Sequence, residues 1–235
     1  MEIKNNYLVF NKNELKIKRK IPARIFVGLC GFDNFKSRED YLLMLHELYD
    51  EQVDPKYLRR GDFAEALVKR CYQRDGKCPT TYEKAEVNWD NFKNVKVWGG
   101  LIDIELPLDQ TLIEVKSKSL NAYDFILKNP PKQEYYQGLF YAYHRNYPTC
   151  IMEWIFFDPE TEADIFEGNM PKTLSKMKRI SKVFEVDRPH MASLLESAEK
   201  IVKDFRENPK HPVASISPEI LQAVIKKQGG SNEQK

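Results

Sequence analysis

Residues 99–116 constrain the fold of this chain more than any other stretch. Two runs rich in aliphatic side chains, 99–105 and 112–116, flank a Pro-Leu-Asp-Gln segment, which is typical of two short strands joined by a turn. Side chains alternate along a strand, so Glu114 and Lys116 share one face while Ile113 and Val115 face a core. If the two strands pair, Asp103 lies beside Glu114. The pattern therefore predicts two carboxylates and one ammonium at a single place on a rigid sheet.

Such a group of charges has two interpretations. Carboxylate oxygens are the ligands that Mg²⁺ prefers, and a nearby lysine can orient a water or help to remove its proton. The alternative is a solvent-exposed hairpin, in which a surface ion pair contributes less than about 1 kcal/mol. Acidic and basic residues alternate on many exposed strands, so the spacing by itself leaves both interpretations open.

Size and composition indicate a soluble globular protein. The 235 residues are enough for one substantial core. No run approaches the roughly 18 apolar residues of a membrane span, and the N-terminus lacks the apolar segment of a signal peptide. The four cysteines form no Cys-x-x-Cys pair and do not lie near histidines, which argues against zinc and against a disulfide framework. We therefore expect a cytoplasmic protein with reduced thiols and no membrane partner.

Two basic segments stand out in a chain whose net charge is only +2. Residues 12–24 contain six basic side chains against one acidic, and residues 172–182 contain five basic side chains and none that is acidic. This local excess favours binding along a phosphate backbone. The alternative is that both segments are solvated faces, as most charge runs are.

Periodicity predicts several helices and strands around the hairpin. Apolar spacing and start signals indicate helices over 41–49, 56–73, 132–145 and 188–207, with shorter ones at 121–128 and 218–227. Strands are expected at 150–157 and 180–186. Residues 7–10 and 15–18 are expected to pair as an N-terminal hairpin.

Two of the predicted helices carry polar residues of interest. Glu65 lies within the helix at 56–73, where a glutamate is usually exposed to solvent. In the helix at 132–145, Gln137 and Tyr141 are four residues apart and therefore share a face. An aromatic stripe is more often core than ligand, but an amide within it needs a polar partner.

The order of these elements resembles the PD-(D/E)xK nuclease superfamily, and the longer pattern resembles its lambda-exonuclease/YqaJ branch of RecB-like nucleases. The resemblance covers roughly residues 20 to 207. Its parts are Arg24 with Gly28, Gly-x-x-x-Glu at 61–65, Gly-Leu-Ile-Asp at 100–103, Leu-Ile-Glu-Val-Lys at 112–116 and Gln-x-x-x-Tyr at 137–141. Ile102 replaces the proline of the family name, and Cys30-Gly31 falls where relatives tend to have serine.

The resemblance implies an α/β fold with a restriction-endonuclease-like core, in which helices flank a central mixed β-sheet. We expect one nuclease domain over residues 1–209, with the hairpin at 1–20 as an appendage. Residues 210–235 are expected to form a partly disordered tail.

The resemblance also implies a metal site. Asp103 and Glu114 would hold one or two Mg²⁺ or Mn²⁺ ions, with the carbonyl of Val115 as a further ligand. Glu65 would hold the second ion or a metal-bound water. Lys116 would orient the attacking water and stabilise negative charge in the transition state, so that no histidine base is needed.

Other residues would contact the substrate. Gln137 would position the reacting group or a phosphate, and a guanidinium is suited to gripping a terminal phosphate. The nucleic-acid contacts that follow from the resemblance are Arg24, Arg59, Arg60, Lys118 and Tyr141.

The implied activity is that of a metal-dependent deoxyribonuclease, a 5′-to-3′ exonuclease acting on linear duplex DNA in phage-type recombination. A single-strand annealing protein would be a partner, the chain would form a trimer, and a phage-encoded protein would work in the host cytoplasm. One alternative is a structure-specific or restriction-type endonuclease of DNA or RNA. A second is a nucleic-acid-binding protein that has lost catalysis.

Overall fold

A computed structural model of the chain describes residues 1–16, 20–82, 90–171 and 174–229. These residues form two compact units. The terminal unit consists of Met1–Glu51, Lys96–Trp98 and Pro189–Lys235, and the sheet unit consists of Gln52–Val95 and Gly99–Arg188. The division into one nuclease domain at 1–209 and a tail from 210 stays a prediction.

The sheet unit is built on four strands in the order β5-β6-β7-β8. Their bounds are Ile104–Leu106 for β5, Thr111–Ser119 for β6, Thr149–Phe157 for β7 and Lys178–Glu185 for β8. β5 and β6 are antiparallel, β6 and β7 are parallel, and β7 and β8 are antiparallel. The predicted mixed sheet in an α/β fold is therefore confirmed.

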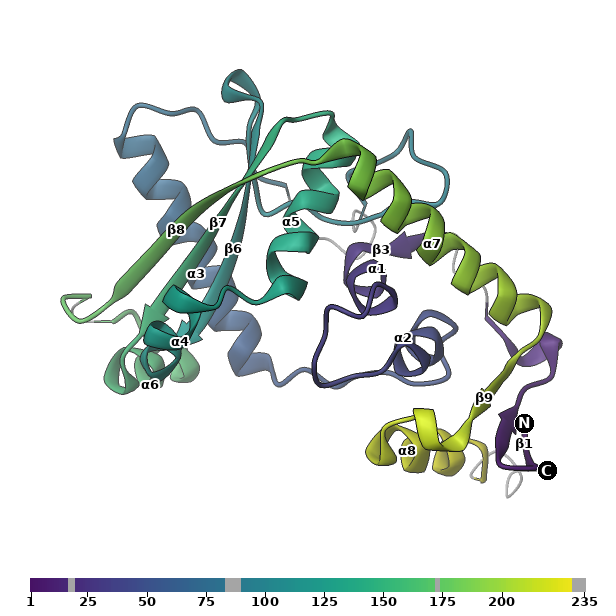
Figure 1. The fold of residues 1–235 in the computed structure, drawn as a ribbon. Coiled ribbons are helices and arrows are strands. Elements are labelled where there is room, and N and C mark those ends of the chain that lie inside the picture. Colours follow the sequence, from purple (N-terminus) through teal and green to yellow (C-terminus); the bar gives the residue numbers. More distant parts are fainter. Residues whose placement is uncertain (17–19, 83–89, 172–173, 230–235) are drawn as a thin grey trace. The chain divides into compact units, whose positions relative to one another are not determined.

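Helices cover both faces of this sheet (Figure 1). The helices of the sheet unit are α3 (Pro55–Arg74), α4 (Tyr123–Lys128), α5 (Lys132–Arg145) and α6 (Pro159–Glu167), with short 3-10 turns at Pro107–Asp109 and Leu120–Ala122. Asp54 caps α3 and Asp158 caps α6 by accepting hydrogen bonds from backbone N–H groups of the first turn. Local caps thus set where both helices begin.

The alternation predicted for β6 decides what each helix covers. Ile113 and Val115 pack with Ala64 and Val68 of α3 in the apolar core. Glu114 lies on the opposite face, under α5. One strand therefore separates an apolar layer below α3 from a polar layer below α5.

The terminal unit contains a second, smaller set of elements. Its strands are β1 (Glu2–Lys4), β2 (Tyr7–Val9) and β9 (Lys210–Pro212), which form one antiparallel sheet, and β3 (Ile21–Pro22), which pairs with β4 (Trp98–Gly99). Its helices are α1 (Ala23–Leu29), α2 (Arg38–Leu45), α7 (Arg188–Glu207) and α8 (Pro218–Gly229), with 3-10 turns at Lys12–Glu14 and Val213–Ser215. A capping box at Ser37 and Asp40 begins α2, as the sequence indicates.

Two strands differ from their predicted bounds. β5 begins at Ile104 rather than at 99, because the backbone of 100–102 bonds to a preceding turn instead of to a strand: Ile102 N donates to Asn91 Oδ1 at 2.7 Å, and Asn91 N donates to Gly100 O at 2.8 Å. The N-terminal hairpin joins Glu2–Lys4 to Tyr7–Val9, and not 7–10 to 15–18. Residues 17 and 18 lie outside the described part of the chain.

Candidate active site

The β5–β6 hairpin brings the predicted acidic residues together. Asp103 immediately precedes β5, and its Oδ2 accepts a hydrogen bond of 2.9 Å from Val115 N of β6. Glu114 is only 2% exposed, although it carries a carboxylate. A buried carboxylate is costly unless it is paired or hydrogen-bonded, so its partners matter.

The partner of Glu114 is Lys116, two residues along the same face of β6. Lys116 Nζ lies 2.6 Å from Glu114 Oε1 and 3.4 Å from Gln137 Oε1 of α5. Gln137 Nε2 in turn donates to the Tyr141 hydroxyl at 3.3 Å. The amide predicted to need a polar partner therefore has two, and it links the lysine to the aromatic layer of α5.

The charges in this group perturb one another. The pKa of Glu114 is raised to about 8: burial raises it most, Asp103 and, to a smaller extent, Glu65 raise it as well, and Lys116 lowers it. Burial by itself would lower the pKa of Lys116, but Glu114 and Asp103 outweigh it, and the pKa is raised. Lys116 therefore keeps its proton, and Glu114 holds one more readily than an ordinary glutamate.

Two glycines let α5 approach this group closely. A Cβ on Gly138 would lie 2.4 Å from Cys150 Sγ of β7 and 3.3 Å from Glu114 Cβ. A Cβ on Gly100 would lie 2.4 Å from Tyr141 Cε1. The two distances of 2.4 Å are shorter than non-bonded heavy atoms tolerate. A larger residue at Gly138 or Gly100 would therefore push α5 away from the sheet.

The donor set is of the kind that a hard divalent cation prefers. Asp103, Glu114 and Glu65 offer carboxylate oxygens, and a cation among them would offset the burial and the repulsion from Asp103 that raise the pKa of Glu114. As they stand, Asp103 bonds to a backbone N–H and Glu114 to Lys116. In the part of the chain that the structure describes, no three His, Cys, Asp or Glu side chains are already grouped as a metal site.

The arginines predicted to grip phosphate have internal partners. Arg60 of α3 pairs with Glu162 of α6 and donates to Ser117 O of β6 at 3.2 Å, and Arg59 donates to the carbonyl of Phe166. These contacts tie α3 to α6 and to the end of β6. Phosphate binding by Arg59 and Arg60 stays a prediction.

Arg24 belongs to the terminal unit, where it pairs with Glu51. The same carboxylate lies 3.1 Å from Lys36 Nζ. Burial would raise the pKa of Glu51, but Arg24 and Lys36 outweigh it, and the pKa is lowered. Arg24, which was predicted to bind phosphate, is therefore paired with the ionised carboxylate of Glu51.

The motifs did not single out Glu134 of α5. Its Oε1 lies 2.5 Å from Lys118 Nζ, and its Oε2 accepts a hydrogen bond of 2.6 Å from Trp154 Nε1. The only sequence signal is its position three residues before Gln137, which places both on one face of the helix. Lys118, predicted to contact nucleic acid, is thus held by a buried acid.

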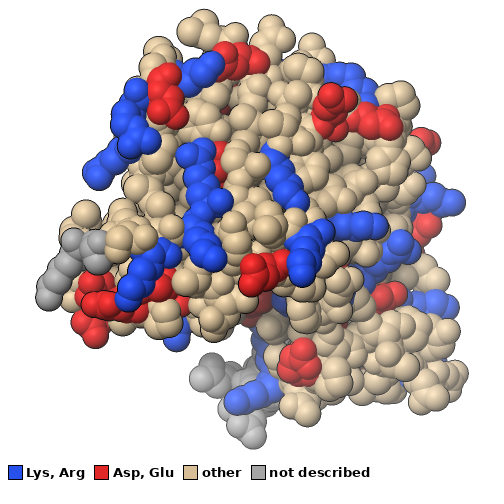
Figure 2. All heavy atoms as spheres, turned by 60° about the vertical axis from the view of Figure 1, so that its left-hand side comes forward, with Lys and Arg blue, Asp and Glu red and all other residues tan. Residues whose placement is uncertain are grey.

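The second basic segment is largely engaged within the protein. Lys178 Nζ lies 4.2 Å from the centre of the Tyr123 ring, Arg179 forms two short hydrogen bonds with buried Glu153, and Lys182 Nζ donates to the backbone of α4. On the face drawn in Figure 2, Lys and Arg side chains stand in separate groups, several of them beside Asp or Glu. Residue 172, the first of this segment, lies outside the described residues.

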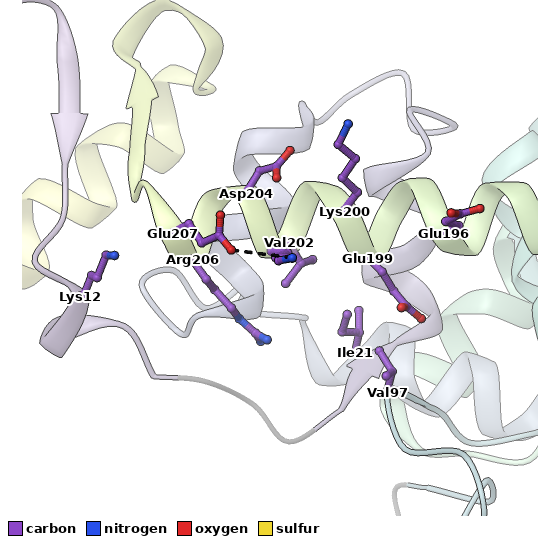
Figure 3. A pocket seen from close by; sticks show the side chains of 11 residues that line it. Lys12, Ile21, Val97, Glu196, Glu199, Lys200, Val202, Asp204, Arg206 and Glu207 are labelled. Carbon is purple, nitrogen blue, oxygen red and sulfur yellow. Dashed lines mark ion pairs between the residues drawn. The ribbon is translucent and has the colours of Figure 1, made fainter.

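A groove in the terminal unit contains none of the predicted site residues. It runs along α7 and is lined by Lys12, Ile21, Val97, Glu196, Glu199, Lys200, Val202, Lys203, Asp204, Arg206 and Glu207 (Figure 3). Acidic and basic side chains are equally represented, and Lys203 pairs with Glu207 at 3.9 Å. Glu199 Oε1 accepts a hydrogen bond of 2.7 Å from Trp98 Nε1. This mixed lining gives no reason to assign the groove a charged ligand.

No helix among the described residues has the length and apolar character needed to span a membrane. All four cysteines are free thiols in the structure.

Comparison with known proteins identifies the fold. No protein-family model and no curated protein sequence matches the chain. A phage related exonuclease from Haemophilus somnus 129PT is similar over 83% of this chain and 96% of its own, with a TM-score of 0.59 and 13% identity. The alkaline exonuclease LHK-Exo from Laribacter hongkongensis is similar over 95% and 97%, with a TM-score of 0.53 and 14% identity. The structure of LHK-Exo in complex with dAMP is similar over 95% of this chain and 97% of its own, with a TM-score of 0.50 and 14% identity.

This chain therefore has the fold of these exonucleases. The predicted resemblance to such nucleases is confirmed at the level of the fold.

Proposed function

We propose that this protein is a metal-dependent deoxyribonuclease that degrades linear duplex DNA from the 5′ end. The observation that carries the proposal is Lys116, whose ammonium lies between the Glu114 carboxylate and the Gln137 amide, beside Asp103. The likeness in fold to two exonucleases supports the same interpretation. A solvent-exposed ion pair does not account for a carboxylate that is 2% exposed.

Asp103, Glu114, Glu65 and the Val115 carbonyl would hold one or two Mg²⁺ or Mn²⁺ ions. When bound, such a cation polarises the phosphate and lowers the pKa of a coordinated water. Glu114 has to be ionised to bind it, so loss of its proton and metal binding are linked.

The chain's own residues supply the remaining chemistry. The pKa of Lys116 is raised, so its ammonium stays charged and can stabilise the negative charge that develops on the phosphate oxygens. Gln137 accepts a hydrogen bond from Lys116 and donates one to Tyr141, which restricts where the ammonium can go. The rigid sheet below these groups keeps them in place before the substrate arrives.

The direction of digestion and the partners belong to the same proposal. LHK-Exo has been solved with dAMP, a deoxynucleoside 5′-monophosphate, which is the kind of product that removal of single nucleotides from either end of a strand releases, so the 5′-to-3′ direction rests on the resemblance. We extend to this chain the partners implied by the resemblance, a homotrimer and a single-strand annealing protein.

The test uses the full-length chain with 5′-phosphorylated linear duplex and covalently closed circular plasmid, each with Mg²⁺, with Mn²⁺ or with EDTA. We expect metal-dependent release of mononucleotides from the linear duplex, none from the circle, and none with Asp103→Ala. Cleavage of the closed circle would indicate an endonuclease. DNA binding without hydrolysis by the folded protein would indicate a binding protein and contradict the proposal.

A further inference from the structure

Strand β6 and helix α5 face each other with two matching rows of polar residues. Side chains two apart on a strand share a face, and so do side chains three or four apart on a helix. The β6 row is Glu114, Lys116 and Lys118, and the α5 row is Glu134, Gln137 and Tyr141. Two pairs connect the rows, Lys116 with Gln137 and Lys118 with Glu134.

Glu134 is the most constrained member of the α5 row. It is 6% exposed, and each of its oxygens has a short partner on a different strand, Lys118 of β6 at 2.5 Å and Trp154 of β7 at 2.6 Å. Trp154 is itself fully buried. These bonds fix the first turn of α5 across the parallel β6–β7 pair, and Gln137 follows on the next turn.

The charge of Glu134 matters as well as its shape. Lys116 and Lys118 are neighbours on one face of β6, with Cα atoms about 6.6 Å apart, so their ammonium groups repel each other. The carboxylate of Glu134 neutralises Lys118 and also lies close enough to act on Lys116. Without it, the charge of Lys118 would be uncompensated and would repel the neighbouring ammonium of Lys116.

We propose that Glu134 is a positioning residue of the site. It compensates the charge of Lys118 beside Lys116 and places α5 so that Gln137 meets Lys116. The inference rests on the proposed nuclease function, since the arrangement it preserves is the one assigned to catalysis.

The first experiment compares steady-state hydrolysis of linear duplex DNA by the wild type, Glu134→Gln, Lys118→Met and the double variant. The glutamine keeps the size of the side chain and can still accept the Trp154 hydrogen bond, so the fold is retained. We expect Glu134→Gln to lower kcat about tenfold through misplacement of Lys116 and Gln137, with KM changed less than about twofold. Removing the unpaired ammonium in the double variant should restore most of the lost kcat.

That recovery separates positioning from a structural role. If Glu134 only stabilised the fold, Glu134→Gln would lower Tm while kcat, measured well below Tm, stayed unchanged, and the double variant would have no lost kcat to restore. Asp109→Asn is the matched control: it removes one carboxylate from the Lys77–Asp109 pair, whose separation is 3.1 Å, outside both rows. Its kcat should equal that of the wild type.

A second readout does not depend on activity. In the ¹⁵N–¹H spectrum of the protein, the indole signal of Trp154 is identified by its loss in Trp154→Phe. We expect this signal to move in Glu134→Gln and also in Lys118→Met, because both change the carboxylate that accepts its proton. A signal that moves in neither variant would overturn the contact, and with it the proposal.

The two proposals fail in different ways. If the wild type hydrolyses DNA and Glu134→Gln keeps its full kcat, the positioning role is wrong and the proposed function stands. If the folded wild type hydrolyses no DNA with either metal, the proposed function fails, and the positioning role is overturned with it.

Discussion

Replacing Gly138 by alanine tests how closely α5 lies on the sheet. The new Cβ would meet Cys150 Sγ at 2.4 Å and Met152 Sδ at 3.1 Å, both on buried side chains of β7. Extra atoms in a packed core cost about 1–3 kcal/mol. Gly61 of α3 is the matched control, since a Cβ there would meet nothing within 4 Å.

Both substitutions gain the same helix propensity, about 1 kcal/mol for alanine over glycine. That gain cancels in the comparison, so the difference between the two variants measures the packing strain, about 1–3 kcal/mol. Each kcal/mol shifts Tm by about 2–4 °C in a chain of this length. Gly61→Ala should therefore melt above the wild type, and Gly138→Ala should melt about 2–12 °C below Gly61→Ala.

Thermal unfolding followed by circular dichroism measures both shifts. Gly138→Ala should also lower kcat, because Gln137 is the preceding residue. Cys150→Ala removes the nearest atom, so it should cost less stability in the Gly138→Ala background than in the wild type. Equal stabilisation by Gly61→Ala and Gly138→Ala would refute the close approach of α5 to the sheet.

Three further predictions concern charge. Lys116→Gln should lower kcat by about 10²–10³-fold with a smaller effect on KM, measured by steady-state kinetics, and a loss of less than about tenfold would contradict its role. Because Glu114 has a raised pKa of about 8, Mg²⁺ or Mn²⁺ affinity measured by calorimetry should increase from pH 6 to pH 9, and Glu114→Gln should weaken binding and flatten that dependence. Burial lowers the pKa of His211 to about 4, from 6.5, so the unfolded chain binds its proton first and the free energy of unfolding should fall as pH drops from about 6.5 towards 4. In urea titrations, His211→Phe should weaken that dependence, and an unchanged pH profile would exclude His211 as its source.

Local signals in the sequence determined much of the fold. Alternation along β6 predicted that Ile113 and Val115 would enter the core and that Glu114 would face the other way, and both hold. The helix start at Ser37 and helical periodicity placed several helices near their observed bounds, whereas helix α6, which Asp158 caps, was not predicted. These features depend on neighbours only a few residues apart, which is why a sequence reveals them.

Tertiary contacts decided the rest. Arg60 pairs with Ser117 and Glu162, which lie 57 and 102 residues further along the chain, and no local pattern predicts such partners. Glu134 looked like one more polar residue of an aromatic helix until β6 and β7 supplied a lysine and an indole N–H.

The hairpin of residues 99–116 combines both kinds of information. Its sequence alone determined the residues of the candidate site and the face they share. Only the tertiary structure decided that Lys116 bonds to Glu114 and Gln137, because the close approach of α5 at Gly138 brings the helix onto that face. Strand alternation sets which β6 residues share the face of the site, while their partners follow from packing between elements distant in the chain.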